Sequence, residues 1–183
     1  MQNYIITGGP GSGKTTLLQA LKNKKYSCYE ESSREVIKAE VLLGSECLPW
    51  KNLACFARKV LHRMEEQLVS RKNDPSSVAF FDRGIPDIIA YLNYGGLKVE
   101  DIYLQILQQH VYESIVFLAP PWEAIYVNDP ERWQTFAEAK KIHEQIIAVY
   151  KSFGFNLVLL PKANVAERVD FVCSMIKQNI ETL

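Results

Sequence analysis

Near its start the chain reads Gly8-Gly9-Pro10-Gly11-Ser12-Gly13-Lys14-Thr15, followed by Thr16. This run has the spacing G-x-x-x-x-G-K-[ST] of a phosphate-binding loop. Glycines let backbone N–H groups turn toward phosphate oxygens, the Lys14 ammonium reaches the β and γ phosphates, and the Thr15 hydroxyl binds magnesium. We therefore expect these residues to bind the polyphosphate of a nucleotide together with Mg²⁺.

The flanking sequence predicts the local structure that such a loop needs. Residues 4–7 form a short apolar run typical of a buried strand, and residues 14–23 contain good helix formers with regularly spaced leucines. The loop would then lie at a strand-to-helix turn, where the helix N-terminus attracts anions. The alternative is a glycine-rich turn with an exposed lysine.

Composition narrows the class of protein. The chain has 183 residues, 48% of them hydrophobic, and its 21 basic residues balance its 21 acidic ones. This length suits one domain, with or without a small lid. Zero net charge argues against a nucleic-acid binder, and no apolar stretch reaches the roughly 20 residues of a membrane helix. The chain enters its first strand almost at once, which leaves no room for a signal peptide, so we expect a cytoplasmic protein.

The cysteines show neither a C-x-x-C pair nor a histidine pair nearby at zinc spacing. They are Cys28, Cys47, Cys55 and Cys173. We interpret all four as reduced, mostly buried thiols.

The order of predicted elements indicates an α/β fold. Continuous apolar runs predict strands at residues 4–7, 26–29, 78–81, 114–119 and 155–160. Predicted helices separate them, at about residues 14–23, 33–43, 51–72, 87–93, 99–112, 131–152 and 164–181. This alternation favours a parallel sheet covered by helices on both faces, within a single domain spanning residues 1–183. Ligands of such folds bind at the carboxyl ends of the strands, so residues that follow a strand are candidates for a site.

The strand at residues 78–81 runs directly into Asp82 and Arg83. In a phosphate-loop protein, a carboxylate at this place binds magnesium, or takes a proton from an attacking hydroxyl. Arg83 can donate a bidentate pair of hydrogen bonds to a phosphate or to the acceptor. The alternative is a surface turn with a capping aspartate and an ion-paired arginine. Asp87, in the first turn of the next helix, fits substrate binding and compensation of the helix dipole equally well.

The residue after Asp82 also argues against one class of protein. Motor ATPases carry a second acidic residue there to polarise water, and this chain has Arg83 instead. The arrangement favours transfer to a bound acceptor over activation of water.

Glu31 and Arg34 follow the second predicted strand. A carboxylate at Glu31 could accept hydrogen bonds from a substrate hydroxyl or amide, and Arg34 could reach an anionic group. The alternative is that Ser32 or Ser33 caps the next helix, with acidic neighbours at its N-terminus.

A further candidate lies beyond the fourth strand. Asp129 and Pro130 predict a helix start, and Arg132 follows in a segment that is often a lid in small-molecule kinases. Arg132 would neutralise the phosphate in transfer, the alternative being a solvated helix arginine. No guanine-reading N-K-x-D motif occurs, which favours adenine. The three histidines lie within predicted helices, where a structural or surface role is expected: His62, His110 and His143.

With these residues in view, the chain resembles a family of small P-loop proteins described as AAA-type predicted ATPases or kinases, similar to the nicotinamide-riboside kinase domain and to nucleoside and nucleotide kinases. The resemblance rests on G-G-P-G-S-G-K-T-T, E-E-S-S-R-E-V-I, F-F-D-R-G-I-P-D-I-I-A-Y, W-E-A-I-Y-V-N-D-P-E-R and R-V-D-F-V, the last including Arg168. It implies ATP, Mg²⁺ and a three-layer α/β/α fold. The five-stranded parallel sheet would have the order 2-3-1-4-5, with a small helical lid at about residues 120–135.

The leading hypothesis is an ATP-dependent kinase acting on a small hydroxyl-bearing metabolite, such as a nucleoside or cofactor precursor. Its catalytic residues would be Lys14, Asp82, Arg83 and Arg132. Thr15 and Asp82 would bind the metal, and the substrate would meet Glu31, Arg34, Arg83 and Asp87. The alternative is a nucleotide-dependent switch or slow ATPase that acts through a protein partner. Both hypotheses exclude nucleic acid and membrane as partners and allow a homo-oligomer.

Overall fold

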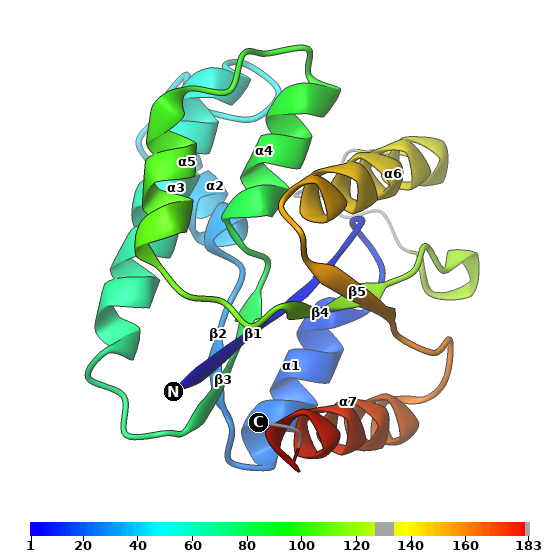
Figure 1. Ribbon diagram of the computed structural model, residues 1–183. Helices are drawn as coiled ribbons and strands as arrows, with labels where there is room; N and C mark the ends of the chain where they lie inside the picture. Colours follow the sequence, from blue (N-terminus) through cyan, green and yellow to red (C-terminus); the bar gives the residue numbers. More distant parts are fainter. Residues whose placement is uncertain (127–133, 182–183) are drawn as a thin grey trace.

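A computed structural model describes residues 1–126 and 134–181. Its centre is a five-stranded parallel sheet in the order β2-β3-β1-β4-β5 (Figure 1). The strands are β1 (Gln2–Gly8), β2 (Ser27–Tyr29), β3 (Val78–Asp82), β4 (Ile115–Ala119) and β5 (Asn156–Leu159). All five predicted strands and the predicted strand order are confirmed.

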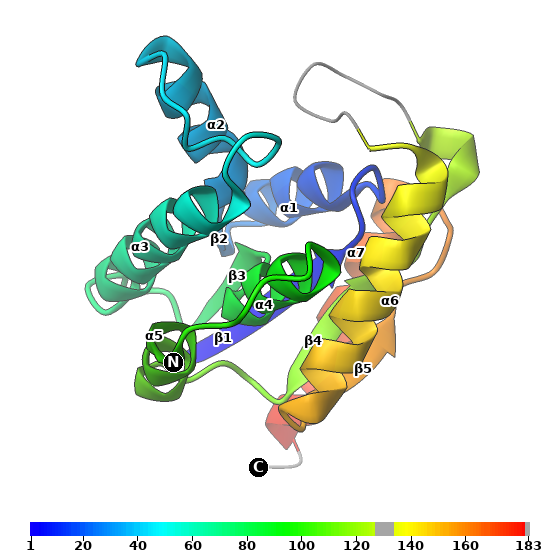
Figure 2. The same cartoon turned by 90° about the horizontal axis from the view of Figure 1, so that it is seen from above.

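In the described residues, seven α-helices connect and flank these strands (Figure 1). They are α1 (Lys14–Asn23), α2 (Ser32–Leu42), α3 (Leu53–Arg71), α4 (Ile85–Tyr94), α5 (Asp101–Gln109), α6 (Phe136–Ser152) and α7 (Val165–Glu181). Helices α1 and α7 lie on one face of the sheet, and α3, α4, α5 and α6 lie on the other (Figures 1 and 2). The predicted three-layer α/β/α architecture is therefore confirmed.

Strand β1 shows why the strands read as unbroken apolar runs. Successive side chains of a strand point to opposite faces of the sheet. Tyr4 and Ile6 belong to the core beneath α1 and α7, whereas Ile5 belongs to the core beneath α3, α4 and α6. All three side chains are fully buried. Because helices cover both faces, neither set of alternating positions is left for polar residues.

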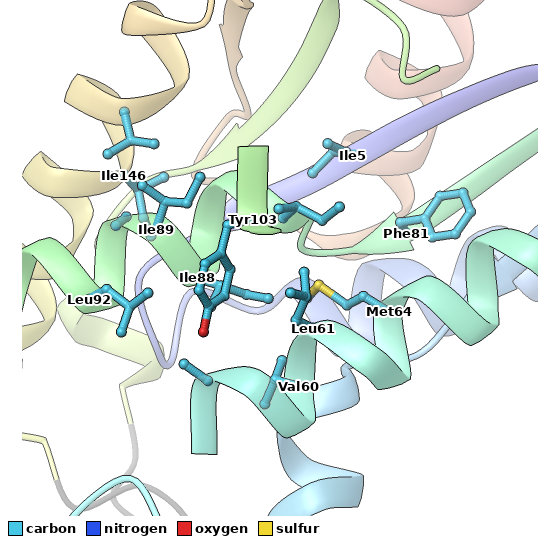
Figure 3. Close-up of a cluster of buried hydrophobic side chains, with 14 of the residues drawn as sticks. Ile5, Val60, Leu61, Met64, Phe81, Ile88, Ile89, Leu92, Tyr103 and Ile146 are labelled. Atoms are coloured by element: carbon cyan, nitrogen blue, oxygen red, sulfur yellow. The ribbon is translucent and has the colours of Figure 1, made fainter. Parts of the chain in front are cut away.

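The larger core lies between the sheet, α3, α4 and α6 (Figure 3). Val60, Leu61 and Met64 of α3 lie against Ile88 and neighbouring residues of α4. This packing fixes the position of α3 relative to the carboxyl end of β3. In contrast, α2 projects outward from the rest of the molecule (Figure 2).

One predicted helix start is wrong. The helix expected from residue 131, after Asp129 and Pro130, begins at Phe136. The Thr135 hydroxyl accepts a hydrogen bond from the Glu138 N–H at 3.2 Å, and the Glu138 carboxylate accepts one from the Thr135 N–H at 2.7 Å. This reciprocal pair satisfies two backbone donors at the new N-terminus. Of the predicted lid at residues 120–135, the described part contains a short 3₁₀ helix, η1 (Glu123–Ile125).

The interpretation of the cysteines is also wrong in part. Cys47 and Cys55 form a disulfide, with their Cα atoms 5.2 Å apart. The turn before α3 brings the two residues together, which their spacing of eight positions did not reveal. Cys28 and Cys173 are free thiols, and all four cysteines are half-buried rather than buried. Among the described helices, none is long and apolar enough to cross a membrane.

Candidate functional site

The phosphate loop and the Asp82–Arg83 pair meet because their strands are neighbours. Strand β1 pairs with β3 in parallel, and Ile6 lies opposite Asp82. The loop leaves β1 two residues later, so both segments emerge at the same edge of the sheet. The Arg83 N–H donates to the Ile6 carbonyl at 3.0 Å, which continues the ladder one residue past β3. The expected meeting of these motifs at the carboxyl ends of the strands is thus observed.

Two glycines of the loop have no room for a side chain. Gly8 has φ 141°, and a Cβ there would collide with the carbonyl oxygen of Ala119 on β4. Gly13 has φ 76°, and a Cβ there would lie 2.8 Å from an Nη of Arg168. Both positions lie in a backbone region that favours glycine. They let the chain turn sharply from β1 into α1.

Lys14 is drawn back into the loop. Its Nζ donates to the carbonyls of Gly8 at 3.2 Å and Gly9 at 3.1 Å, and to the Ser12 hydroxyl at 3.4 Å. Burial and then the neighbouring Arg83 lower the pKa of Lys14 to about 8, despite the nearby carboxylates. The hydrogen-bond acceptors of Lys14 are neutral oxygens of two carbonyls and one hydroxyl. A phosphate group can replace them.

A cavity of about 700 Å³ extends from the phosphate loop to a space lined by residues of α2, α3 and α4. Its loop end is lined by residues 10–16, with the Thr15 and Thr16 side chains in the exposed first turn of α1. Its polar middle is lined by Glu31, Arg34, Arg83 and Asp87. The structure thus brings together the predicted phosphate-binding and substrate-binding residues around one space.

Asp82 is not among the described residues that line this cavity. Its side chain is buried, and its Oδ1 has no hydrogen-bond partner in the described part of the chain. Burial, reinforced by the charge of Glu31, raises the pKa of Asp82 to about 7, although Lys14 and Arg83 oppose the shift. A buried carboxylate oxygen without a partner is unusual and marks a place for a proton or a cation.

Arg83 is held rigidly at the centre of the site. Its backbone has φ 75°, an uncommon conformation for a residue other than glycine. Its Nε donates to Glu31 Oε1 at 2.9 Å, and its Nη1 donates to the Gly8 carbonyl at 2.9 Å and to Asp87 Oδ1 at 3.2 Å. The guanidinium therefore links the N-terminus of α2, the phosphate loop and α4.

Asp87 is the main anchor of this arrangement. Besides Arg83, its carboxylate accepts hydrogen bonds from the Thr7 hydroxyl at 2.5 Å, the Tyr150 hydroxyl at 2.5 Å and the Gly84 N–H at 2.9 Å. Asp87 is 1% exposed. These contacts hold the carboxylate in place beside Arg83, so they fit a residue that positions Arg83. The predicted substrate contact of Asp87 stays a prediction.

Glu31, not Ser32 or Ser33, is the residue before the first turn of α2. Its carboxylate accepts hydrogen bonds from Arg83, from the Ser33 hydroxyl at 3.1 Å and from the Arg34 Nε at 3.4 Å. Burial alone would raise the pKa of Glu31, but Arg83 and Lys14 outweigh it and lower the pKa to about 2. Glu31 is therefore an anion at any physiological pH.

Two residues of the site carried no assigned role in the sequence analysis. Arg168 of α7 is buried, lines the cavity, and donates through Nη1 to the carbonyls of Ser12 at 3.4 Å and Gly13 at 3.3 Å. Its Nε and Nη2 have no partner among the described residues. His143 of α6 is buried beside the loop, and burial together with Lys14 lowers its pKa to about 4. Both lie on helices, so no strand end marked them.

Arg132 is expected to supply positive charge, and Thr15 and Asp82 are expected to bind a metal. Arg132 falls within residues 127–133, outside the described residues. No group of three or more histidine, cysteine, aspartate or glutamate side chains that could hold a metal occurs in the described ranges. A Mg²⁺ ion bound mainly by phosphate and water needs only one or two protein ligands, which Thr15 and Asp82 can supply.

Comparison with known proteins agrees with this geometry. Residues 3–168 match the model of the AAA_28 family, described as an AAA domain. No curated protein sequence matches significantly.

Among solved structures, the chain is similar to the NadR protein in complex with NR, with TM-score 0.76 and 17% identity over 97% of this chain and 51% of that one. It is similar to deoxyadenosine kinase from M. mycoides, with TM-score 0.68 and 14% identity over 97% and 100% of the two chains. It is also similar to thymidylate kinase from Candida albicans, with TM-score 0.69 and 15% identity over 97% and 92%. At these identities the likeness concerns the fold.

Proposed function

Because the chain belongs to the AAA_28 family of AAA domains, we propose that it is an ATP-dependent kinase that transfers the γ-phosphoryl group to a small hydroxyl-bearing molecule. One observation carries the proposal. The cavity that begins at the phosphate loop continues past Glu31 and Arg83 into a second space lined by α2, α3 and α4. A phosphoryl donor at the loop and a separate acceptor would thus meet at Arg83. The resemblance makes nucleosides and cofactor precursors such as nicotinamide riboside the first acceptors to test.

The loop end of the cavity would bind ATP. Backbone N–H groups of residues 8–13 and of the first turn of α1 face the phosphates, and Lys14 exchanges its carbonyl partners for phosphate oxygens. Thr15 and Asp82 would hold Mg²⁺, a fit supported by the partnerless Oδ1 of Asp82 and the exposed hydroxyl of Thr15. When bound, this ion neutralises charge that develops on the phosphates.

The transfer itself needs a proton acceptor and positive charge. A bond forms between the acceptor oxygen and the γ-phosphorus as the bond to the bridging oxygen of ADP breaks, and the hydroxyl proton passes to a carboxylate. We assign that role to Asp82, whose pKa of about 7 suits a general base. Glu31, with a pKa of about 2, is the weaker base. Arg83, and Arg132 from the proposed lid, would stabilise the negative charge in transfer.

The exposed tip of α2 supports a second candidate function. Leu42 and Leu43 are 88% and 75% exposed, and Trp50 in the following turn is 44% exposed. Large exposed apolar side chains that lie together often mark a surface for a protein partner. This arrangement favours the alternative of a nucleotide-dependent switch or slow ATPase.

One assay separates the two functions. Purified chain is incubated with ATP and Mg²⁺, and ADP release is followed with and without nucleosides, nicotinamide riboside and pantothenate-like alcohols. A kinase releases ADP faster with an acceptor and forms the phosphorylated acceptor, which mass spectrometry detects. Equal release with and without every acceptor contradicts the kinase and favours the switch.

A further inference from the structure

One face of α3 supplies only apolar side chains to the cavity. Leu53, Phe56, Val60 and Met64 all line it. Their spacing of three, four and four positions places them on a single stripe of the helix. Phe56, Val60 and Met64 are at most 7% exposed. This wall is therefore well packed and not a set of mobile surface side chains.

Helix α4 supplies the adjoining wall. Ile88 and Tyr91 line the same part of the cavity, and Figure 3 shows Val60 and Met64 of α3 beside Ile88 of α4. The Tyr91 ring lies 5.6 Å from the Arg83 guanidinium. The two walls thus form an apolar arm of the cavity, and Tyr91 marks the boundary between that arm and the polar middle.

The polar middle carries balanced charge. Arg83 and Arg34 both donate to Glu31, and Arg83 also pairs with Asp87. Two guanidinium groups therefore face two carboxylates. A second phosphate at this point, such as that of a nucleoside monophosphate, would compete with Glu31 and Asp87 for cations that they already hold. The charges favour an acceptor without an anionic group.

The apolar arm has few groups that would read a nucleobase. Asp87 is the one charged side chain that α3 and α4 bring to the cavity in the described part of the chain, and both its oxygens are occupied. Tyr91 and Tyr94, whose hydroxyls can form hydrogen bonds, are the other polar residues that these two helices bring there. Polar edges of a base buried against the apolar stripe of α3 would lose hydrogen bonds to water with few replacements. Each such loss weakens binding about tenfold or more.

We propose, resting on the kinase function above, that the acceptor is an uncharged alcohol with an aromatic or branched aliphatic body. The body lies in the apolar arm against α3 and α4, and the hydroxyl lies at the polar middle beside Arg83, the neighbour in sequence of the proposed base Asp82. Transfer converts this alcohol and ATP into a phosphate monoester, ADP and one proton. The arm thereby selects against nucleosides and nucleotides.

A panel of acceptors tests the substrate class. ADP release by the full chain with ATP and Mg²⁺ is compared for 3-phenyl-1-propanol and 3-methyl-2-buten-1-ol, for adenosine and thymidine, and for thymidine monophosphate. We expect kcat/KM to be at least tenfold higher for one of the two alcohols than for any nucleoside or nucleotide. A nucleoside or nucleotide as the best acceptor would overturn the inference and leave the kinase intact.

Two variants test the place of binding. Leu53→Asn puts an amide at the half-buried entrance of the arm, and Val60→Thr changes one buried methyl to a hydroxyl at nearly constant shape. Each should raise KM for the alcohol at least fivefold and change the Kd of a non-hydrolysable ATP analogue less than twofold. The matched control is Leu42→Asn, at an 88% exposed leucine outside the cavity, for which KM should change less than twofold. An unchanged KM in both arm variants contradicts the proposed position.

A binding readout separates this inference from the kinase proposal. If no compound raises ADP release, the kinase function is contradicted. Thermal unfolding in the presence of the ATP analogue then tests whether the apolar arm binds the alcohols. Stabilisation by the alcohols that Leu53→Asn abolishes supports the apolar arm as an alcohol site. Stabilisation by nucleosides alone, or by no compound, overturns it.

Discussion

The two ends of the cavity offer different groups for binding. The phosphate loop offers backbone groups and one lysine, all within a single stretch of sequence. The apolar arm offers side chains on α3 and α4, which only tertiary packing brings together. The first kind of site is general for polyphosphates, whereas the second depends on the shape and polarity of one molecule. A short motif therefore identifies the donor, and the acceptor has to be inferred from three-dimensional structure.

Replacing Lys14 should impair phosphate binding at the loop end of the cavity and leave the apolar arm unchanged. In Lys14→Ala we expect turnover to fall about 10²- to 10³-fold, the usual effect of losing one group that stabilises charge in a transition state. Initial rates of ADP formation measure it. The control is Lys22→Ala on the same helix, whose side chain is 53% exposed. Normal turnover in Lys14→Ala would show that the loop does not hold the transferred phosphate.

The effect of replacing Asp82, the buried carboxylate at the end of β3, is followed by two measurements. Asp82→Asn should lower turnover at least about 10²-fold, as expected when a general base is lost. The second readout is the stability of metal-free protein. The raised pKa of about 7 means that folding favours protonated Asp82, so the ionisation of Asp82 costs the wild type stability as pH rises from about 4 through 7.

Thermal unfolding with a chelator should therefore show Asp82→Asn more stable relative to wild type at pH 8 than at pH 4. Asp101→Asn, at an exposed position, is the control variant. A constant difference between Asp82→Asn and wild type across this range would mean that Asp82 is not buried as an unpaired acid.

The difference between a local motif and residues brought together by tertiary packing explains what could be predicted from sequence. The strands and the loop were predictable because each has a local signal, such as the buried apolar run before Gly8. The start of α6 was predicted wrongly because Pro130 and the Thr135–Glu138 pair both signal a helix start, and the pair prevails. Arg168 reaches the loop from α7 across a sequence separation of 156 positions, a contact that exists only after folding.

Replacing Asp87 tests whether this residue anchors Arg83, which lies in the polar middle between the two ends of the cavity. Asp87→Ala should lower the free energy of unfolding by about 3–5 kcal/mol, because it leaves the buried Arg83 charge without one of its partners. Denaturant titration measures this. Tyr150→Phe removes a single donor to the same carboxylate and should cost only about 1 kcal/mol. Equal, small losses in the two variants would mean that Asp87 does not anchor Arg83.

The smallest expected effect concerns the entrance of the apolar arm. The disulfide between Cys47 and Cys55 ties the start of α3 to the preceding turn, and Pro49 and Leu53 between them line the cavity. By loop-closure entropy, Cys47→Ser should lower the free energy of unfolding by about 2–3 kcal/mol. Dithiothreitol should produce the same loss in wild type and no further loss in the variant, as denaturant titration would show.

The control for this prediction is Cys28→Ser, since Cys28 is a free thiol at a similar depth. If the two ends of the cavity are independent, Cys47→Ser should weaken binding in the apolar arm and leave the Kd of an ATP analogue within twofold. A reductant-insensitive wild type would mean that the two thiols stay unpaired in solution. A change in ATP affinity would mean instead that the turn before α3 is coupled to the phosphate loop, and that the division between the two ends is less complete than their chemistry suggests.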